Sequence, residues 1–98
     1  MEKKTPHCKL TIVKALIERG NVRTTHSARV GAEALNLDLC DMLAVVLALE
    51  PRDFYKSMTT HGDHTVWQDV YRPYTKAGSV YLKLTVIEDV LIVSFKEL

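Results

Sequence analysis

Side chains that can handle phosphate chemistry recur through the second half of the chain. They are Lys56, Gln68, Arg72, Tyr81, Lys83 and Lys96. Ammonium groups stabilise phosphate charge, and an ammonium close to a phenol lowers the pKa of that phenol, so a tyrosine there can serve as acid or base. Such a set suits RNA cleavage without a metal, in which a 2′-hydroxyl loses a proton and a 5′-oxygen gains one.

The last predicted hairpin places three of these side chains together. A two-residue turn at Glu88-Asp89 pairs Ile87 with Val90, Lys83 with Ser94, and Tyr81 with Lys96. Because alternate residues of a strand point to opposite faces, Tyr81, Lys83 and Lys96 then share one face. The other face is apolar and is expected to hold Leu82, Leu84, Val86, Leu91, Val93 and Phe95.

Two preceding β-prone runs can extend the polar face. A four-residue loop at 75–78 sets Arg72 opposite Tyr81 and Gln68 opposite Thr85, whereas an odd-length loop would turn that strand over. If Lys56 joins the same side, one open surface holds all six residues with almost no acid to balance them. Antiparallel sheets often have one face in water, so an ordinary solvated face is the commoner explanation of this spacing.

Helices are expected in the first half of the chain. The predicted elements are a helix over about residues 6–19, a possible edge strand over 22–25, a brief helix capped by Ser27 that runs to Leu35, and a helix capped by Asp38 that ends before Pro51. Thr5-Pro6 matches an N-cap and first helical residue, and Gly20-Asn21 supplies a stop. Apolar residues at three- and four-residue spacing support each helix.

Strands are expected afterwards. The β-prone runs are Phe54–Thr60, Val66–Tyr74, Val80–Ile87 and Val90–Lys96, separated by turn-forming residues. Helices followed by strands indicate an α+β fold, with N-terminal helices packed on one face of a twisted antiparallel sheet. The length of 98 residues predicts a single domain over 1–98.

Charge and composition restrict the function less than the motifs do. The formal net charge is +1, but residues 1–30 carry seven basic residues against two acidic ones. This segment can follow a phosphate backbone or can simply be a solvated helix face. No apolar run is long enough to cross a membrane and no signal segment is seen, so we expect a cytoplasmic protein. Cys8 and Cys40 are expected to be free thiols of a reducing compartment.

Other chemical motifs are weaker. His61-Gly62-Asp63-His64 has histidines at a metal-binding spacing, but its glycine and aspartate favour a solvated turn. Ser57 and Ser94 have no local base and no nucleophile-elbow glycines, and no glycine-rich phosphate loop is present. We therefore expect neither a metal nor another cofactor.

The chain resembles the MqsR family of motility quorum-sensing regulator toxins. The segments that carry the resemblance are F-Y-K-S-M-T-T (54–60), H-T-V-W-Q-D-V-Y-R-P (64–73), V-Y-L-K-L-T-V-I (80–87) and D-V-L-I-V-S-F-K (89–96). The resemblance runs from the opening M-E-K-K-T-P-H to the closing L-I-V-S-F-K-E and loosens between residues 8 and 52.

The resemblance implies a RelE-like fold and an mRNA interferase that halts translation, favours GCU sites and acts without the ribosome. It also implies a zinc-containing, DNA-binding, MqsA-like antitoxin, through which alone the toxin would reach operator DNA. The family's proposed functional residues correspond to Lys56, Gln68, Tyr81 and Lys96. We add Arg72, Lys83 and Arg23 as secondary RNA-binding candidates.

The resulting hypothesis is a bacterial endoribonuclease acting by 2′-hydroxyl attack, which leaves a 2′,3′-cyclic phosphate and a 5′-hydroxyl. A first alternative is a non-catalytic module that binds RNA or protein through the same face. A second is a structural subunit of a repressor complex.

Overall fold

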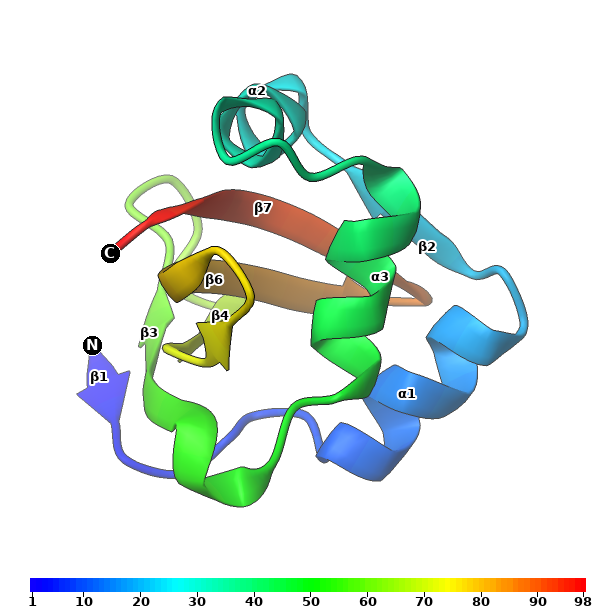
Figure 1. Cartoon of the computed structure of the whole chain (residues 1–98). Helices are drawn as coiled ribbons and strands as arrows, with labels where there is room; N and C mark the ends of the chain where they lie inside the picture. Colours follow the sequence, from blue (N-terminus) through cyan, green and yellow to red (C-terminus); the bar gives the residue numbers. More distant parts are fainter.

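Three α-helices precede most of a seven-stranded sheet in the computed structural model, which describes residues 1–98 (Figure 1). In chain order the elements are β1 (Glu2–Lys3), α1 (Leu10–Glu18), β2 (Val22–Thr24), α2 (His26–Ala34), α3 (Leu39–Leu47), a 3-10 turn η1 (Pro51–Asp53), β3 (Phe54–Thr59), β4 (Trp67–Tyr71), β5 (Tyr74–Thr75), β6 (Gly78–Ile87) and β7 (Asp89–Glu97). The expected α+β class is confirmed. None of the helices is long and apolar enough to cross a membrane.

The sheet is mixed. Its main strand order is β1-β3-β4-β6-β7-β2. The short strand β5 also pairs with β6 and so lengthens the hairpin that β4 forms with β6. The expectation of a wholly antiparallel sheet is wrong at one edge, because β2 pairs in parallel with β7. The two strands are far apart in the chain, so no tight turn sets their relative direction. The predicted edge strand itself is confirmed.

All three helices contribute to one core on one face of the sheet. In Figure 1, α3 lies across β6 and β7, and α2 lies beside β7. The core is formed by Val13, Ile17, Ala28, Ala32, Leu37, Met42, Val46, Leu49, Tyr71, Val80, Leu82, Leu84, Val90, Ile92 and Phe95. Helix α2 approaches β7 closely at Gly31, where an added Cβ would lie 1.9 Å from the Phe95 carbonyl oxygen. The opposite face of the sheet is left without a helix.

The first helix starts later than expected. It begins at Leu10 rather than near Pro6, and its N-cap residue Lys9 is extended, with φ −65° and ψ 139°. The buried Asp69 carboxylate accepts the N–H groups of His7 and Cys8, each at 3.0 Å, and so holds the segment before the helix against β4. The stop at Gly20 is confirmed, with a positive φ of 81°.

The caps of the next two helices follow side-chain oxygens. In α2 the cap is Thr25 rather than Ser27, and its hydroxyl accepts the Ala28 N–H at 3.1 Å. In α3 the predicted cap at Asp38 is confirmed, and Asp41 completes a reciprocal capping box.

The turn of the last hairpin differs from the expectation. Glu88 alone forms the tip, with a positive φ of 68°, and Ile87 pairs with Asp89 rather than with Val90. An irregularity between Lys83 and Leu84 then shifts the register by one residue. Beyond that point the predicted pairs Lys83–Ser94 and Tyr81–Lys96 are confirmed.

This shift also changes which residues of β7 reach the core. Val90 and Ile92 are fully buried in the core, whereas Leu91 and Val93, expected there, are only partly buried. Moving the pairing by one residue turns every side chain of that segment to the other face. The core prediction was therefore wrong for the turn end of β7 and right for Leu82, Leu84 and Phe95.

Candidate active site

The open face of the sheet carries a row of side chains from four neighbouring strands. Lys56 of β3 pairs with Val70 of β4, Val70 pairs with Lys83 of β6, and Lys83 pairs with Ser94 of β7. Side chains at paired positions point to the same face, so Lys56 and Lys83 lie on either side of Val70.

A second row lies beside the first. Tyr81 pairs with Lys96, and the β4–β6 register continues from the pair Tyr71–Leu82 to place Arg72 next to Tyr81. The predicted loop of four residues at 75–78 is wrong in length, because Thr75 pairs with Gly78 and only Lys76 and Ala77 form the turn. The predicted register between the two strands is nevertheless confirmed by the pair Tyr71–Leu82. The structure therefore brings all six predicted residues to one face, opposite the helices.

Val70 shows how closely these side chains surround it. It has no exposed surface although no helix covers this face. The longer side chains around it must therefore close over it, as the aliphatic stems of lysine readily do. The half-buried state of Lys56, Gln68 and Lys83 agrees with this arrangement. At the centre of the face a buried apolar residue is therefore surrounded by the polar ends of longer side chains.

Tyr81 and Lys96 are in contact. The Lys96 ammonium lies 5.2 Å from the centre of the Tyr81 ring. A positive charge at this distance interacts favourably with the electrons of the ring. The pair therefore places a cation beside a phenol, a side chain that can transfer a proton, on the same small area of the sheet.

Lys56 is held as a cation. Its ammonium donates to the Glu2 carboxylate at 3.1 Å, and only 20% of its side chain is exposed. The Glu2 hydrogen bond and charge raise the pKa of Lys56, with smaller contributions in the same direction from Tyr55 and Tyr81. A lysine with a raised pKa remains protonated, so Lys56 suits charge stabilisation and does not suit the role of general base.

Gln68 lies further along β4 on the same face. It pairs with Met58 and stands two residues from Val70, which makes it a diagonal neighbour of Lys56 across the strand pair. Its amide can both donate and accept hydrogen bonds, as the positioning of a phosphate or a base requires.

Tyr55 joins this face, and the sequence analysis missed it. Phe54 pairs with Tyr71 and Lys56 pairs with Val70, so Tyr55 is the extra residue of a bulge in β3. Its ring is approached by Arg72 at 4.4 Å, by Lys4 at 5.2 Å and by Lys56 at 5.4 Å. Strict alternation would have placed Tyr55 on the opposite face, and no simple sequence signal marks such a bulge.

Arg23 is not brought into this cluster. It lies on the edge strand β2, with β4, β6 and β7 between it and the strand that carries Lys56. Its guanidinium makes two hydrogen bonds to Asp89, at 2.7 Å and 3.2 Å. The Asp89 carboxylate raises the pKa of Arg23 and balances its charge locally.

The histidine motif at 61–64 forms a turn. Asp63 accepts the Thr65 N–H at 2.9 Å and donates its own N–H to the Thr60 hydroxyl at 3.0 Å. Hydrogen bonds from Thr65 lower the pKa of Asp63. No three metal-ligating side chains come together anywhere in the chain.

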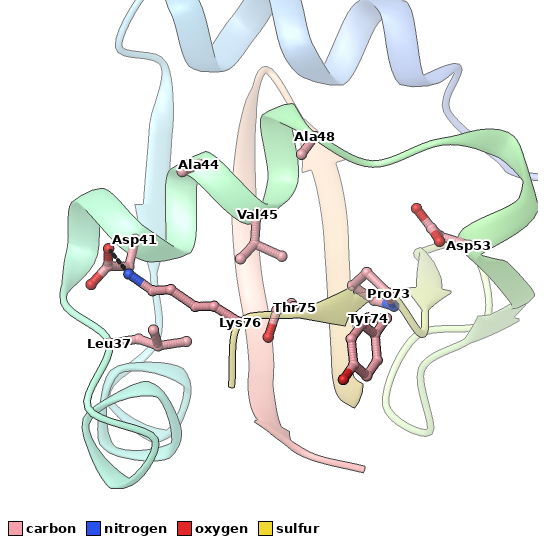
Figure 2. A pocket seen from close by; sticks show the side chains of 10 residues that line it. All are labelled: Leu37, Asp41, Ala44, Val45, Ala48, Asp53, Pro73, Tyr74, Thr75 and Lys76. Atoms are coloured by element: carbon pink, nitrogen blue, oxygen red, sulfur yellow. Dashed lines mark hydrogen bonds and ion pairs between the residues drawn. The ribbon is translucent and has the colours of Figure 1, made fainter. Parts of the chain in front are cut away.

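A groove of about 310 Å³ lies elsewhere, between α3 and β5. Figure 2 shows Lys76 reaching across one end of it to Asp41, at 3.2 Å, while Val45 and Ala48 line its side. Its one lysine is already paired, and Asp53 adds a second acid. Phosphate chemistry therefore fits the open face of the sheet better than this groove.

Two comparisons with known proteins identify the family of this chain. Residues 5–97 match the family model described as "Motility quorum-sensing regulator, toxin of MqsA". The chain is also 61% identical over 97 residues to the mRNA interferase toxin MqsR of Escherichia coli (strain K12), covering 99% of each chain. This chain therefore belongs to the MqsR family of motility quorum-sensing regulator toxins.

Proposed function

We propose that this protein is an mRNA interferase, an endoribonuclease toxin that cuts messenger RNA and so inhibits translation. The observation that carries the proposal is the open face on which Tyr81, Lys96 and Lys56 converge, in a chain 61% identical to a protein of that name. No helix covers this face, so a single RNA strand has access to it.

The proposed reaction is a transfer within the RNA strand. The 2′-oxygen bonds to the adjacent phosphorus, the bond from phosphorus to the 5′-oxygen breaks, and the products carry a 2′,3′-cyclic phosphate and a 5′-hydroxyl. One proton leaves the 2′-hydroxyl and one reaches the 5′-oxygen, so no water, metal or cofactor is needed for the balance.

The site residues divide these tasks. Tyr81 takes part in one of the two proton transfers, and Lys96 at 5.2 Å from its ring stabilises the charge that the phenol and the phosphate develop. Lys56, held protonated by Glu2, stabilises the phosphorane. Gln68 positions the scissile phosphate or a neighbouring base, and Arg72 and Lys83 bind flanking phosphates.

The family description points to a protein partner. Its members are toxins of MqsA, and we infer a cognate antitoxin of that kind for this chain. We further infer that the antitoxin binds zinc and DNA, that operator DNA is contacted only through it, and that the pair works in the bacterial cytoplasm. GCU as the preferred site, action without the ribosome and one toxin domain over 1–98 belong to the same proposal.

The test is cleavage of a defined RNA by antitoxin-free protein in excess EDTA. Wild type is compared with Tyr81→Phe and Lys56→Ala, and cleaved ends are analysed for a cyclic phosphate. Metal-independent cuts by wild type that both variants lose would support the enzyme and its face together. RNA binding without cleavage by folded wild type would overturn the proposal and indicate a binding module, and equal cleavage by all three would reject this site.

A further inference from the structure

A second basic site lies near Phe54, the first residue of β3, outside the row of side chains on the open face. It is a cavity of about 610 Å³ between the segment that leads into α1 and the turn that leads into β3. Lys4 and Lys9 line it on one side, and Pro51 and Phe54 line it on the other. Cavities of about 300–1,000 Å³ are the usual size of small-ligand sites in proteins.

The electrostatics of this cavity favour an anion. Lys4 and Lys9 are exposed, and neither forms an ion pair. Helix α1 begins in the same wall with Leu10, no side chain caps it, and its first turn contains no acidic residue. The free N–H groups and the helix dipole therefore add to the two lysine charges.

The rest of the wall is apolar and contains one unsatisfied donor. The rings of Phe54 and Tyr71 pack edge to face, with centres 5.5 Å apart. Tyr71 is fully buried, and its hydroxyl has no hydrogen-bond partner in the protein. Buried donors are almost always paired, so the wall of the cavity contains a donor that no group of the protein satisfies. The apolar surface of Pro51 and the partly exposed Phe54, beside two cations, matches a nucleotide, which combines a base with a phosphate.

Lys4 connects this cavity to the open face. Its ammonium lies 5.2 Å from the centre of the Tyr55 ring, and Arg72 lies 4.4 Å from the same centre. Two cations near one exposed aromatic ring can bind neighbouring phosphates of an RNA strand while a base stacks on the ring.

We infer that the cavity between residues 4–11 and 51–54 is a subsite for a nucleotide of the RNA substrate that flanks the scissile phosphate. Lys4 and Lys9 bind its phosphate, and Pro51 and Phe54 contact its base. The inference rests on the proposed ribonuclease function. It makes the basic N-terminal segment part of the RNA path rather than only a solvated surface.

The test compares two RNAs and four proteins. The RNAs are the shortest one that wild type cuts and the same one extended by several nucleotides on both sides. The proteins are wild type, Lys4→Ala/Lys9→Ala, Lys4→Arg/Lys9→Arg, and the charge-matched control Arg19→Ala/Lys76→Ala, whose exposed cations lie outside the cavity. The measurements are kcat/KM at several salt concentrations and the urea midpoint of each protein.

We expect Lys4→Ala/Lys9→Ala to lose about tenfold in kcat/KM on the extended RNA and nothing on the short one. The salt dependence on the extended RNA should become shallower by about 0.7 for each phosphate that the variant no longer neutralises. The arginine variant should retain most of the activity, and the control should behave as wild type.

Other results would overturn the inference. An equal loss on both RNAs would place the two lysines in the chemistry or the fold, and no loss on either would leave the cavity without a role in RNA binding. A loss of antitoxin binding in place of the length-dependent effect would assign the cavity to a protein partner. If wild type cuts neither RNA, the proposed ribonuclease function fails, and that result is distinct from failure of the subsite.

Discussion

The two faces of the sheet are made by the same strands and differ in what covers them. On the covered face, Leu82, Leu84 and Phe95 are buried under the helices and belong to the core. On the open face, the residues between them are lysines, a tyrosine and a serine, and only their own stems bury Val70.

Alternate residues of one strand therefore have different roles. Those on the covered face stabilise the fold, and those on the open face are available for chemistry. Burial of apolar area stabilises the fold and requires particular shapes on the covered face. The open face contributes little to that packing, so its side chains are free to carry charge. Substitutions at neighbouring positions should therefore have separable effects.

The largest effects should come from a neighbouring pair in β6. Tyr81→Phe should lower the cleavage rate about 100-fold or more, because a proton-transfer group is lost, with little change in stability. Leu82→Ala should reduce the free energy of unfolding by about 2–5 kcal/mol, because it opens a cavity in the core. Cleavage rates per folded molecule and urea denaturation check both, and a large stability loss in Tyr81→Phe would break the separation of the faces.

Asp69 should matter next, because it holds the segment before α1 from the covered face. Asp69→Asn keeps one acceptor and places an amide donor against the other backbone N–H, so we expect a loss of about 1.5–3 kcal/mol in the free energy of unfolding. Hydrogen exchange at His7 and Cys8 should accelerate. Asp63→Asn, in the exposed turn, is the control. Unchanged exchange at both amides would contradict the role of Asp69.

Gly31 tests how close a helix must approach the covered face. A Cβ there would lie 1.9 Å from the Phe95 carbonyl oxygen, so α2 must move away from β7. Gly31→Ala should destabilise the protein by about 1–3 kcal/mol despite the better helix propensity of alanine. Gly62→Ala is the control, since its added Cβ meets nothing within 4 Å. Thermal denaturation would refute the close contact if Gly31→Ala proved neutral.

The smallest effect concerns the exposed pair Arg23–Asp89 at the far edge of the sheet. The Arg23 hydrogen bond lowers the pKa of Asp89 below its ordinary value of 3.8. A depressed folded-state pKa stabilises the protein above the unfolded value, and this contribution disappears as the pH falls through the folded value. Asp89→Asn should therefore lose slightly less stability than wild type on acidification, and urea midpoints across that range would measure it. Identical slopes would mean that the pair contributes nothing.

The sequence predicted which residues share a face where a strand has one solvent-exposed face and one buried face. Tyr81, Lys83 and Lys96 could be assigned to a common face because alternation with buried neighbours fixes the register. The Glu88 tip was not predicted, and the pairing far from it was correct only because an irregularity between Lys83 and Leu84 shifts the register by one residue.

Other features depend on contacts that no local pattern contains. The segment before α1 is held by Asp69, more than sixty residues away in the chain. The place of Tyr55 follows from a single extra residue in β3, whose cost depends on the strands on both sides. The family resemblance named Lys56 and Gln68, but it did not indicate that Glu2 would hold Lys56.

The ion pair between Glu2 and Lys56, together with the Tyr81–Lys96 contact, has a consequence for the order of synthesis. The open face is assembled from residues 2 to 96, so a growing chain that has not released residue 96 from the ribosome lacks the complete set. Domains fold as units once enough of their chain has emerged. The complete open face can therefore form only after residue 96 has emerged and β7 has paired with β6.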